Sequence, residues 1–187
     1  GGGEILVWGG GGGEPYRDLE AEVSRAERGP KVSGRYRVKI DNMSPVLVIY
    51  TSGTTGMPKG VPCTHIKMVG AGLVVEMAVR LTRRDRGYIS MPLFHSNAWY
   101  IGILSLMIAG GSFVLKRRFS ASAFEEDMLE HGVTFLNYVG QPLHYILAAL
   151  EKKYGSSEEV ERALARHPDN RFRVAYGNGA PAVDREK

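Results

Sequence analysis

A ten-residue loop dense in glycine and hydroxyl side chains is the part of this 187-residue sequence best suited to chemistry. It covers residues 51–60 (TSGTTGMPKG) and directly follows an apolar run at residues 46–50. Its glycines let backbone N–H groups approach oxygen atoms closely, and its hydroxyls can donate hydrogen bonds or ligate a phosphate-bound Mg²⁺. The loop therefore predicts polyphosphate binding, although its lysine is not followed by Ser or Thr, as a Walker A loop requires. The predicted phosphate ligands are Thr51, Ser52, Gly53, Thr54, Thr55, Gly56 and Lys59, and Thr51 is also the candidate Mg²⁺ ligand.

The elements around this loop alternate between strands and helices. The β-branched run at residues 46–50 is typical of a strand covered on both faces, and Leu143, Ile146, Leu147 and Leu150 share one face of a helix. This alternation predicts an α/β fold with a mostly parallel sheet flanked by helices. The expected strands are residues 46–50, 88–91, 113–115, 133–139 and 172–176, and the expected helices include residues 64–81 and 97–109.

The composition divides the chain into a glycine-rich and polar segment, residues 1–44, and an α/β domain, residues 45–187. The net charge of +4 is mild, and the basic clusters at residues 83–86 and 116–118 are not interleaved with aromatic residues, so we expect no nucleic-acid binding. The single cysteine, Cys63, is consistent with a cytoplasmic protein. We expect no secretory signal.

Residue spacing also disfavours two further classes of protein, those with a metal cluster and those with a membrane-spanning helix. The five histidines are scattered, which argues against a metal cluster. Residues 98–115 form a long, nearly apolar run, but Gly110 and Gly111 divide it. A buried helix leading into a buried strand explains this run better than a membrane-spanning helix.

Three blocks of the sequence resemble, in the expected order, the adenylate-forming superfamily, which includes acyl-CoA synthetases, luciferases and adenylation domains of peptide synthetases. Residues 50–61 resemble the superfamily's signature loop. Residues 91–99 (MPLFHSNAW) resemble its second block, whose histidine lies near the acyl-binding site. Residues 176–181 (YGNGAP) resemble the glycine-rich turn that packs against adenine. The resemblance covers roughly residues 45–187 and implies part of the large N-terminal domain of such an enzyme.

Finer likenesses within the superfamily favour fatty-acid enzymes. Residues 94–99 are similar to long-chain fatty acyl-CoA synthetases, where a tryptophan gates the acyl tunnel, and residues 135–140 resemble the fatty-acid-transport-protein branch. The resemblance implies that His95, Asn97 and Trp99 contact the acyl substrate, with His95 as the candidate catalytic residue. It also implies that Gly177, Asn178, Gly179, Ala180 and Pro181 contact adenine.

The resemblance implies a fatty acid–CoA ligase that uses ATP, Mg²⁺ and coenzyme A. A carboxylate attacks the α-phosphorus of ATP to give acyl-AMP and pyrophosphate, and coenzyme A then displaces AMP. The expected partner is a small-molecule carboxylate, namely a long-chain fatty acid. Peripheral membrane contact and a homodimer stay open. The superfamily's magnesium-binding glutamate, ribose-binding aspartate and C-terminal domain would come after Lys187, so we expect the 187 residues alone to be inactive.

Alternative functions stay open. Residues 172–182 also fit the strand, glycine turn and helix of a Rossmann-type dinucleotide-binding domain, although the acidic residue expected about 20 positions later would lie beyond Lys187. A second alternative is a non-catalytic homologue that binds a nucleotide or a fatty acid. Among enzymes, a fatty acyl-AMP ligase, an aromatic-acid ligase and an amino-acid adenylation domain are further candidates.

Overall fold

The computed structural model describes residues 5–7, 16–18, 21, 23–25, 39–51, 57–116 and 118–180. The chain divides into two compact units, Gly1–Ile40 and Asp41–Lys187. In the first unit, β1 (Ile5–Val7) pairs in parallel with β2 (Tyr16–Asp18). The second unit contains all three blocks to which the sequence assigns chemistry.

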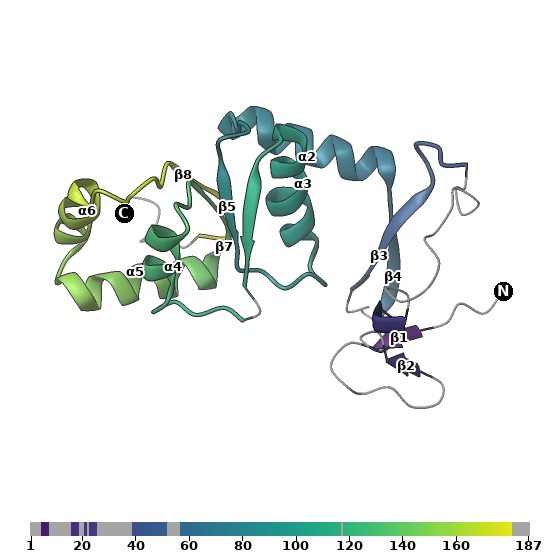
Figure 1. Ribbon diagram of the computed structural model, residues 1–187, viewed down its shortest axis with the longest axis horizontal. Helices are drawn as coiled ribbons and strands as arrows, with labels where there is room; N and C mark the ends of the chain where they lie inside the picture. The colour runs from purple at the N-terminus through teal and green to yellow at the C-terminus, as the bar shows by residue number, and fades with distance from the viewer. Residues whose placement is uncertain are drawn as a thin grey trace. The chain divides into compact units, whose positions relative to one another are not determined.

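A four-stranded parallel sheet is the frame of the second unit (Figure 1). Its strands are β5 (Arg86–Ile89), β6 (Ser112–Leu115), β7 (Phe135–Val139) and β8 (Val174–Asn178), in the order β6-β5-β7-β8. Every neighbouring pair is parallel. The predicted α/β fold with a parallel sheet flanked by helices is therefore confirmed.

Helices cover both faces of this sheet, because parallel strands need long connections. On one face lie the π-helix η2 (Ala98–Ile103) and α3 (Leu104–Ala109), which connect β5 to β6. On the other face lie α4 (Phe124–Glu130), α5 (Gly140–Tyr154) and α6 (Ser157–Arg166), as Figure 1 shows. No helix within the described residues is long and apolar enough to cross a membrane.

Alternating side chains on the strands divide the interior into two apolar cores. Ile89 and Phe135 belong to the core under η2 and α3. Their sequence neighbours Tyr88 and Leu136 belong to the core under α4 and α5. The predicted apolar face of α5 is confirmed by Ile146 and Leu150, which are buried, and by Leu143 and Leu147, which lie on the same side of the helix. This second core is completed by Phe124, Met128 and Val133.

The strand containing the run at residues 46–50 differs from the expectation. It forms β3 (Pro45–Thr51), which pairs antiparallel with β4 (Lys59–Thr64) in a separate two-stranded sheet. Only Ile49 of β3 is buried, so the expectation of a strand covered on both faces is wrong. Strand β4 was not expected, and α2 (His65–Val79) begins directly after it. The predicted strand–loop–helix is therefore a hairpin followed by a helix.

Candidate functional site

The carboxyl ends of three parallel strands meet at one edge of the sheet, and two of the predicted blocks follow these ends. Residues 91–99 follow β5, and residues 177–180 form the end of β8 and its continuation. The chain connects β5 to β6 over one face and β6 to β7 over the other, so the strand order changes direction between β5 and β7. In open α/β sheets, ligands bind outside the carboxyl ends of the strands at such a switch point.

The block at residues 91–99 forms a turn that leads into η2. The backbone N–H of His95 donates to the Pro92 carbonyl oxygen at 2.9 Å, and the ring centroids of Phe94 and His95 are 5.0 Å apart. The Trp99 indole N–H donates to the Leu93 carbonyl oxygen at 2.7 Å. The indole therefore closes the turn, while the His95 imidazole is exposed and accessible to a ligand.

Asn97 connects this turn to the neighbouring strand β7. Its side-chain amide N–H donates to the Tyr138 carbonyl oxygen at 3.3 Å, and its Oδ1 accepts from Asn137 Nδ2 at 2.6 Å. Asn137 is fully buried, and its own Oδ1 has no hydrogen-bond partner among the described residues. The Asn97 side chain thus holds the turn against β7, and its predicted contact with the acyl substrate stays a prediction.

The block at residues 177–180 lies against the end of β7, at a distance that only glycine permits. A Cβ at Gly177 would lie 2.0 Å from the Tyr138 carbonyl oxygen, and a Cβ at Gly140 would lie 1.7 Å from the Gly179 carbonyl oxygen. Gly179 also has a φ of +70°, which favours glycine. The Tyr138 carbonyl group thus accepts from Asn97 and lies close to Gly177, which brings the predicted acyl and adenine blocks together. Pro181 lies outside the described residues.

The ends of the predicted phosphate loop are placed at the tip of the β3–β4 hairpin. Thr51 and Lys59 are directly paired in the ladder, and the Thr51 hydroxyl donates to the Lys59 carbonyl oxygen at 3.5 Å. Both residues are exposed. The remaining predicted phosphate ligands, Ser52, Gly53, Thr54, Thr55 and Gly56, lie outside the described residues.

The hairpin is joined to η2 by a small apolar cluster. Ile49 and Cys63 are buried there, and Trp99 and Tyr100 pack against them. The Tyr100 hydroxyl donates to Cys63 Sγ at 2.9 Å. Burial and this contact raise the pKa of Tyr100 to about 12, so the phenol stays a neutral donor at physiological pH. The hairpin and the His95 turn are therefore attached to the same short helix.

Sequence reasoning missed three members of this arrangement: Asn137, Tyr138 and Tyr100. Asn137 carried a usable signal, because an amide in a strand otherwise rich in aromatic and β-branched residues requires a buried partner. The roles of Tyr138 and Tyr100 depend on contacts with residues about 40 positions away. No group of three or more His, Cys, Asp or Glu side chains in the described part of the chain could hold a metal ion.

The comparisons with known proteins agree on one family. The AMP-binding enzyme family matches residues 7–183. The chain is 40% identical over 167 residues to the medium/long-chain-fatty-acid–CoA ligase FadD17 of Mycobacterium marinum, covering 89% of this chain and 30% of that protein. It is 33% identical over 130 residues to long-chain fatty acid transport protein 2 of Rattus norvegicus, covering 69% of this chain and 21% of that protein.

A solved structure supports the same relationship. A malonyl-CoA ligase bound to methylmalonyl-CoA and AMP superimposes with a TM-score of 0.62 at 32% identity, covering 78% of this chain and 30% of that chain. The predicted resemblance to acyl-CoA synthetases and fatty-acid-transport proteins is thus confirmed, and the chain spans less than a third of the length of these relatives. The chain belongs to the AMP-binding enzyme family.

Proposed function

We propose that this chain is the nucleotide- and carboxylate-binding segment of an ATP-dependent fatty acyl-CoA synthetase. One observation carries the proposal: Tyr138 joins the His95 turn, through Asn97, to the glycine block at Gly177. This contact lies at the switch point of a parallel sheet, where a ligand is expected. The ligase and transport-protein names of the relatives favour a fatty acid as the carboxylate.

The proposed reaction has two steps. An oxygen of the fatty acid carboxylate attacks the α-phosphorus of ATP, forming acyl-AMP as pyrophosphate leaves. The thiol of coenzyme A then loses its proton to solvent and attacks the acyl carbon, and AMP leaves with the bonding electrons as the thioester forms. In the first step, protein side chains need form no covalent bond. They act by positioning the two substrates and stabilising the phosphate charge.

We assign the phosphate end to the hairpin tip. Lys59 supplies a positive charge, and the hydroxyls of Thr51 and of residues 52, 54 and 55 supply hydrogen-bond donors. Magnesium bound to substrate phosphates would neutralise their charge. It commonly takes few protein ligands and keeps its waters, so the single Thr51 hydroxyl fits such an ion despite the lack of an acidic cluster in the described residues.

We assign the other end of the substrates to the edge of the sheet. The exposed His95 imidazole is the group that would touch the reacting carboxylate, and Trp99 borders the acyl chain. Backbone groups of residues 177–180 would pack against adenine, with Pro181 continuing this block. Asn97 acts as a positioning residue for the turn. A fatty acid substrate also favours a cytoplasmic protein that makes contact with membrane surfaces.

Binding of Mg²⁺-ATP to the 187-residue chain, measured by titration calorimetry, tests the phosphate assignment. Lys59→Ala should weaken binding at least about tenfold, because a charge-assisted contact contributes roughly 1.5–3 kcal/mol. Lys67→Ala is the matched control, since Lys67 is an exposed lysine on α2, outside the proposed site. Equal losses in the two variants would contradict the assignment, and binding of NADH in place of ATP would favour the dinucleotide-binding alternative.

A further inference from the structure

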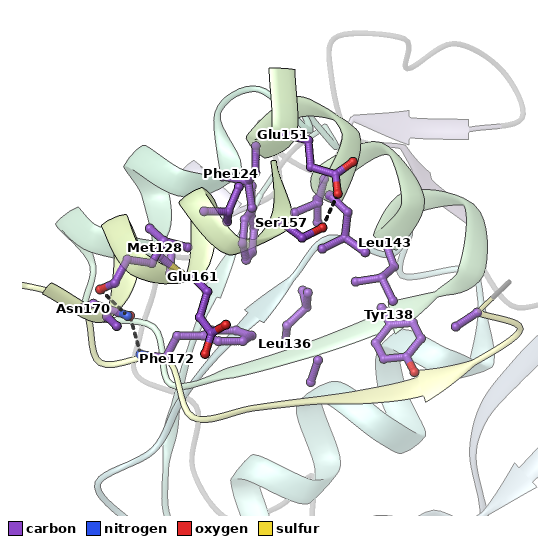
Figure 2. A pocket seen from close by; sticks show the side chains of 18 residues that line it. Phe124, Met128, Leu136, Tyr138, Leu143, Glu151, Ser157, Glu161, Asn170 and Phe172 are labelled. Atoms are coloured by element: carbon purple, nitrogen blue, oxygen red, sulfur yellow. Dashed lines mark hydrogen bonds between the residues drawn. The ribbon is translucent and has the colours of Figure 1, made fainter. Parts of the chain in front are cut away.

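An apolar cavity of about 530 Å³ lies on the face of the sheet that α4, α5 and α6 cover (Figure 2). Its floor is the β7 and β8 surface at Leu136 and Ala175, and its walls come from α4, α5 and α6. Leu136 belongs to the core under α4 and α5, whereas Trp99 packs against the core under η2 and α3. The cavity therefore lies on the opposite face from the proposed acyl contact at Trp99, while Tyr138 and Ala180 line the part of it that adjoins the proposed adenine block. Its volume is within the usual range for small-molecule sites, roughly 300–1,000 Å³.

Helix α6 closes this cavity without burying itself. None of its residues is buried, and its apolar side chains Val160 and Leu164 line the cavity. Polar contacts hold both ends of the helix: the Ser157 hydroxyl donates to the Glu151 carboxylate, and Asn170 Nδ2 donates to the Leu164 carbonyl oxygen at 3.0 Å. The helix is thus fixed at its ends over an apolar space that an apolar ligand would fill favourably.

The charges of the lining select the kind of ligand. Glu151 and Glu161 are the charged residues among those that line the cavity, and no Lys, Arg or His lines it within the described residues. Figure 2 shows both carboxylates among the lining side chains. Carboxylates repel a fatty acid's carboxylate but accept hydrogen bonds from an ammonium or a hydroxyl group.

We propose that this cavity is an accessory binding site for an amphiphile with an apolar tail and an amine or hydroxyl head group. The tail lies against Leu136 and Ala175, and the head group donates to Glu161. The site excludes the anionic fatty acids that serve as substrate in the proposed function, and it needs neither ATP nor turnover.

Titration calorimetry of the 187-residue chain with octylamine, 1-octanol and octanoate at neutral pH tests this proposal. Octylamine should bind at least tenfold more tightly than octanoate, with octanol between them. Raising the salt concentration should reduce the preference for the amine, since the carboxylates are partly exposed to solvent. Octanoate binding as tightly as octylamine would overturn the proposal.

Three variants locate the site. Ala175→Leu places a larger side chain into the cavity and should weaken all three probes at least tenfold, whereas Ala148→Leu, at an exposed position of α5 outside the lining, should change none of them. Glu161→Gln should reduce the amine preference severalfold and weaken octanol binding less, because the Gln amide oxygen still accepts a hydrogen bond from the hydroxyl. Glu158→Gln, an exposed α6 residue outside the lining, is its control. An unchanged amine preference in Glu161→Gln would refute the assigned head-group contact, even if Ala175→Leu fails to fold.

Discussion

Asn97→Ala should destabilise the chain more than Asn137→Leu, although Asn137 is the more deeply buried of the two residues. Asn97→Ala removes the 2.6 Å hydrogen bond from Asn137 and the 3.3 Å bond to the Tyr138 carbonyl oxygen. The fully buried Asn137 amide is then left without a partner among the described residues, because its Oδ1 has none already. An unsatisfied buried amide costs about 1–3 kcal/mol and a lost neutral hydrogen bond about 0.5–1.5 kcal/mol, so we expect roughly 2–4 kcal/mol in total.

Asn137→Leu removes the same hydrogen bond but also removes the buried orphan oxygen. The new side chain faces the apolar core that contains Ile89 and Phe135, and the half-buried Asn97 can satisfy its amide with water. We therefore expect a change in the free energy of unfolding within about 1 kcal/mol, because replacing a buried polar group by an apolar one of similar size can be nearly neutral. The double variant should be more stable than Asn97→Ala alone.

Urea unfolding followed by circular dichroism measures these differences, provided that the transitions are two-state and the m-values agree. The reasoning would be refuted if Asn137→Leu cost as much as Asn97→Ala, since Asn137 would then make a strong contact that its geometry does not show. Hydrogen exchange adds a local readout: the His95 amide, bonded to the Pro92 carbonyl oxygen, should exchange faster in Asn97→Ala.

Two further predictions concern the frame of the site. Gly177→Ala should destabilise the chain by about 1–3 kcal/mol or prevent folding, because its Cβ would lie 2.0 Å from the Tyr138 carbonyl oxygen. Thermal unfolding measures this effect. The control is Gly70→Ala on α2, where a Cβ meets nothing within 4 Å. Burial raises the pKa of Asp85, but hydrogen bonds from Thr134, Thr82 and Arg173 outweigh it, so the net pKa is lowered. Asp85 therefore stabilises the fold above the usual aspartate pKa of about 3.9. This contribution is lost as the pH falls below that value. Asp85→Asn should therefore be less stable than the wild type at neutral pH, and its free energy of unfolding should decrease less on acidification.

These predictions have clear contradicting results. Equal melting temperatures for Gly177→Ala and the wild type would show that β8 is not packed closely against Tyr138. Parallel loss of stability in acid for Asp85→Asn and the wild type would show that Asp85 does not carry the acid sensitivity.

The parallel sheet could be predicted because its signal is local. The strands β5, β6 and β7 are short and each is followed by a helix, so strand and helix alternate along the chain as far as β8. The apolar face of α5 was predicted for the same reason, since helical spacing alone places Ile146 and Leu150 together.

The hairpin could not be predicted because its pairing depends on tertiary structure. A β-branched run has the same composition in an exposed hairpin as in a buried strand, and only its neighbours decide which one forms. Strand β4 contains Gly60 and Pro62, which are poor strand formers, and proline is tolerated there because a two-stranded sheet has free edges.

The site was predicted as separate blocks rather than as one arrangement. The motifs identified His95 and residues 177–180, but the residues that connect these blocks, Asn137 and Tyr138, lie in a strand about 40 residues from each. The sequence identified Asn97 only as part of the block at residues 91–99, whereas its hydrogen-bond partners in the structure lie on β7. Distant pairing of this kind is not visible in sequence spacing.

The central claim is that this segment supports adenylation of a fatty acid, and one exchange assay tests it most directly. Residues 7–183 would replace the matching segment of the Mycobacterium marinum ligase, and ATP–pyrophosphate exchange would be measured with fatty acids of increasing length. We predict exchange that requires a fatty acid and falls at least tenfold in Lys59→Ala but not in Lys67→Ala. A folded chimera that binds ATP yet shows no exchange with any carboxylate would contradict the claim and favour a non-catalytic binding role.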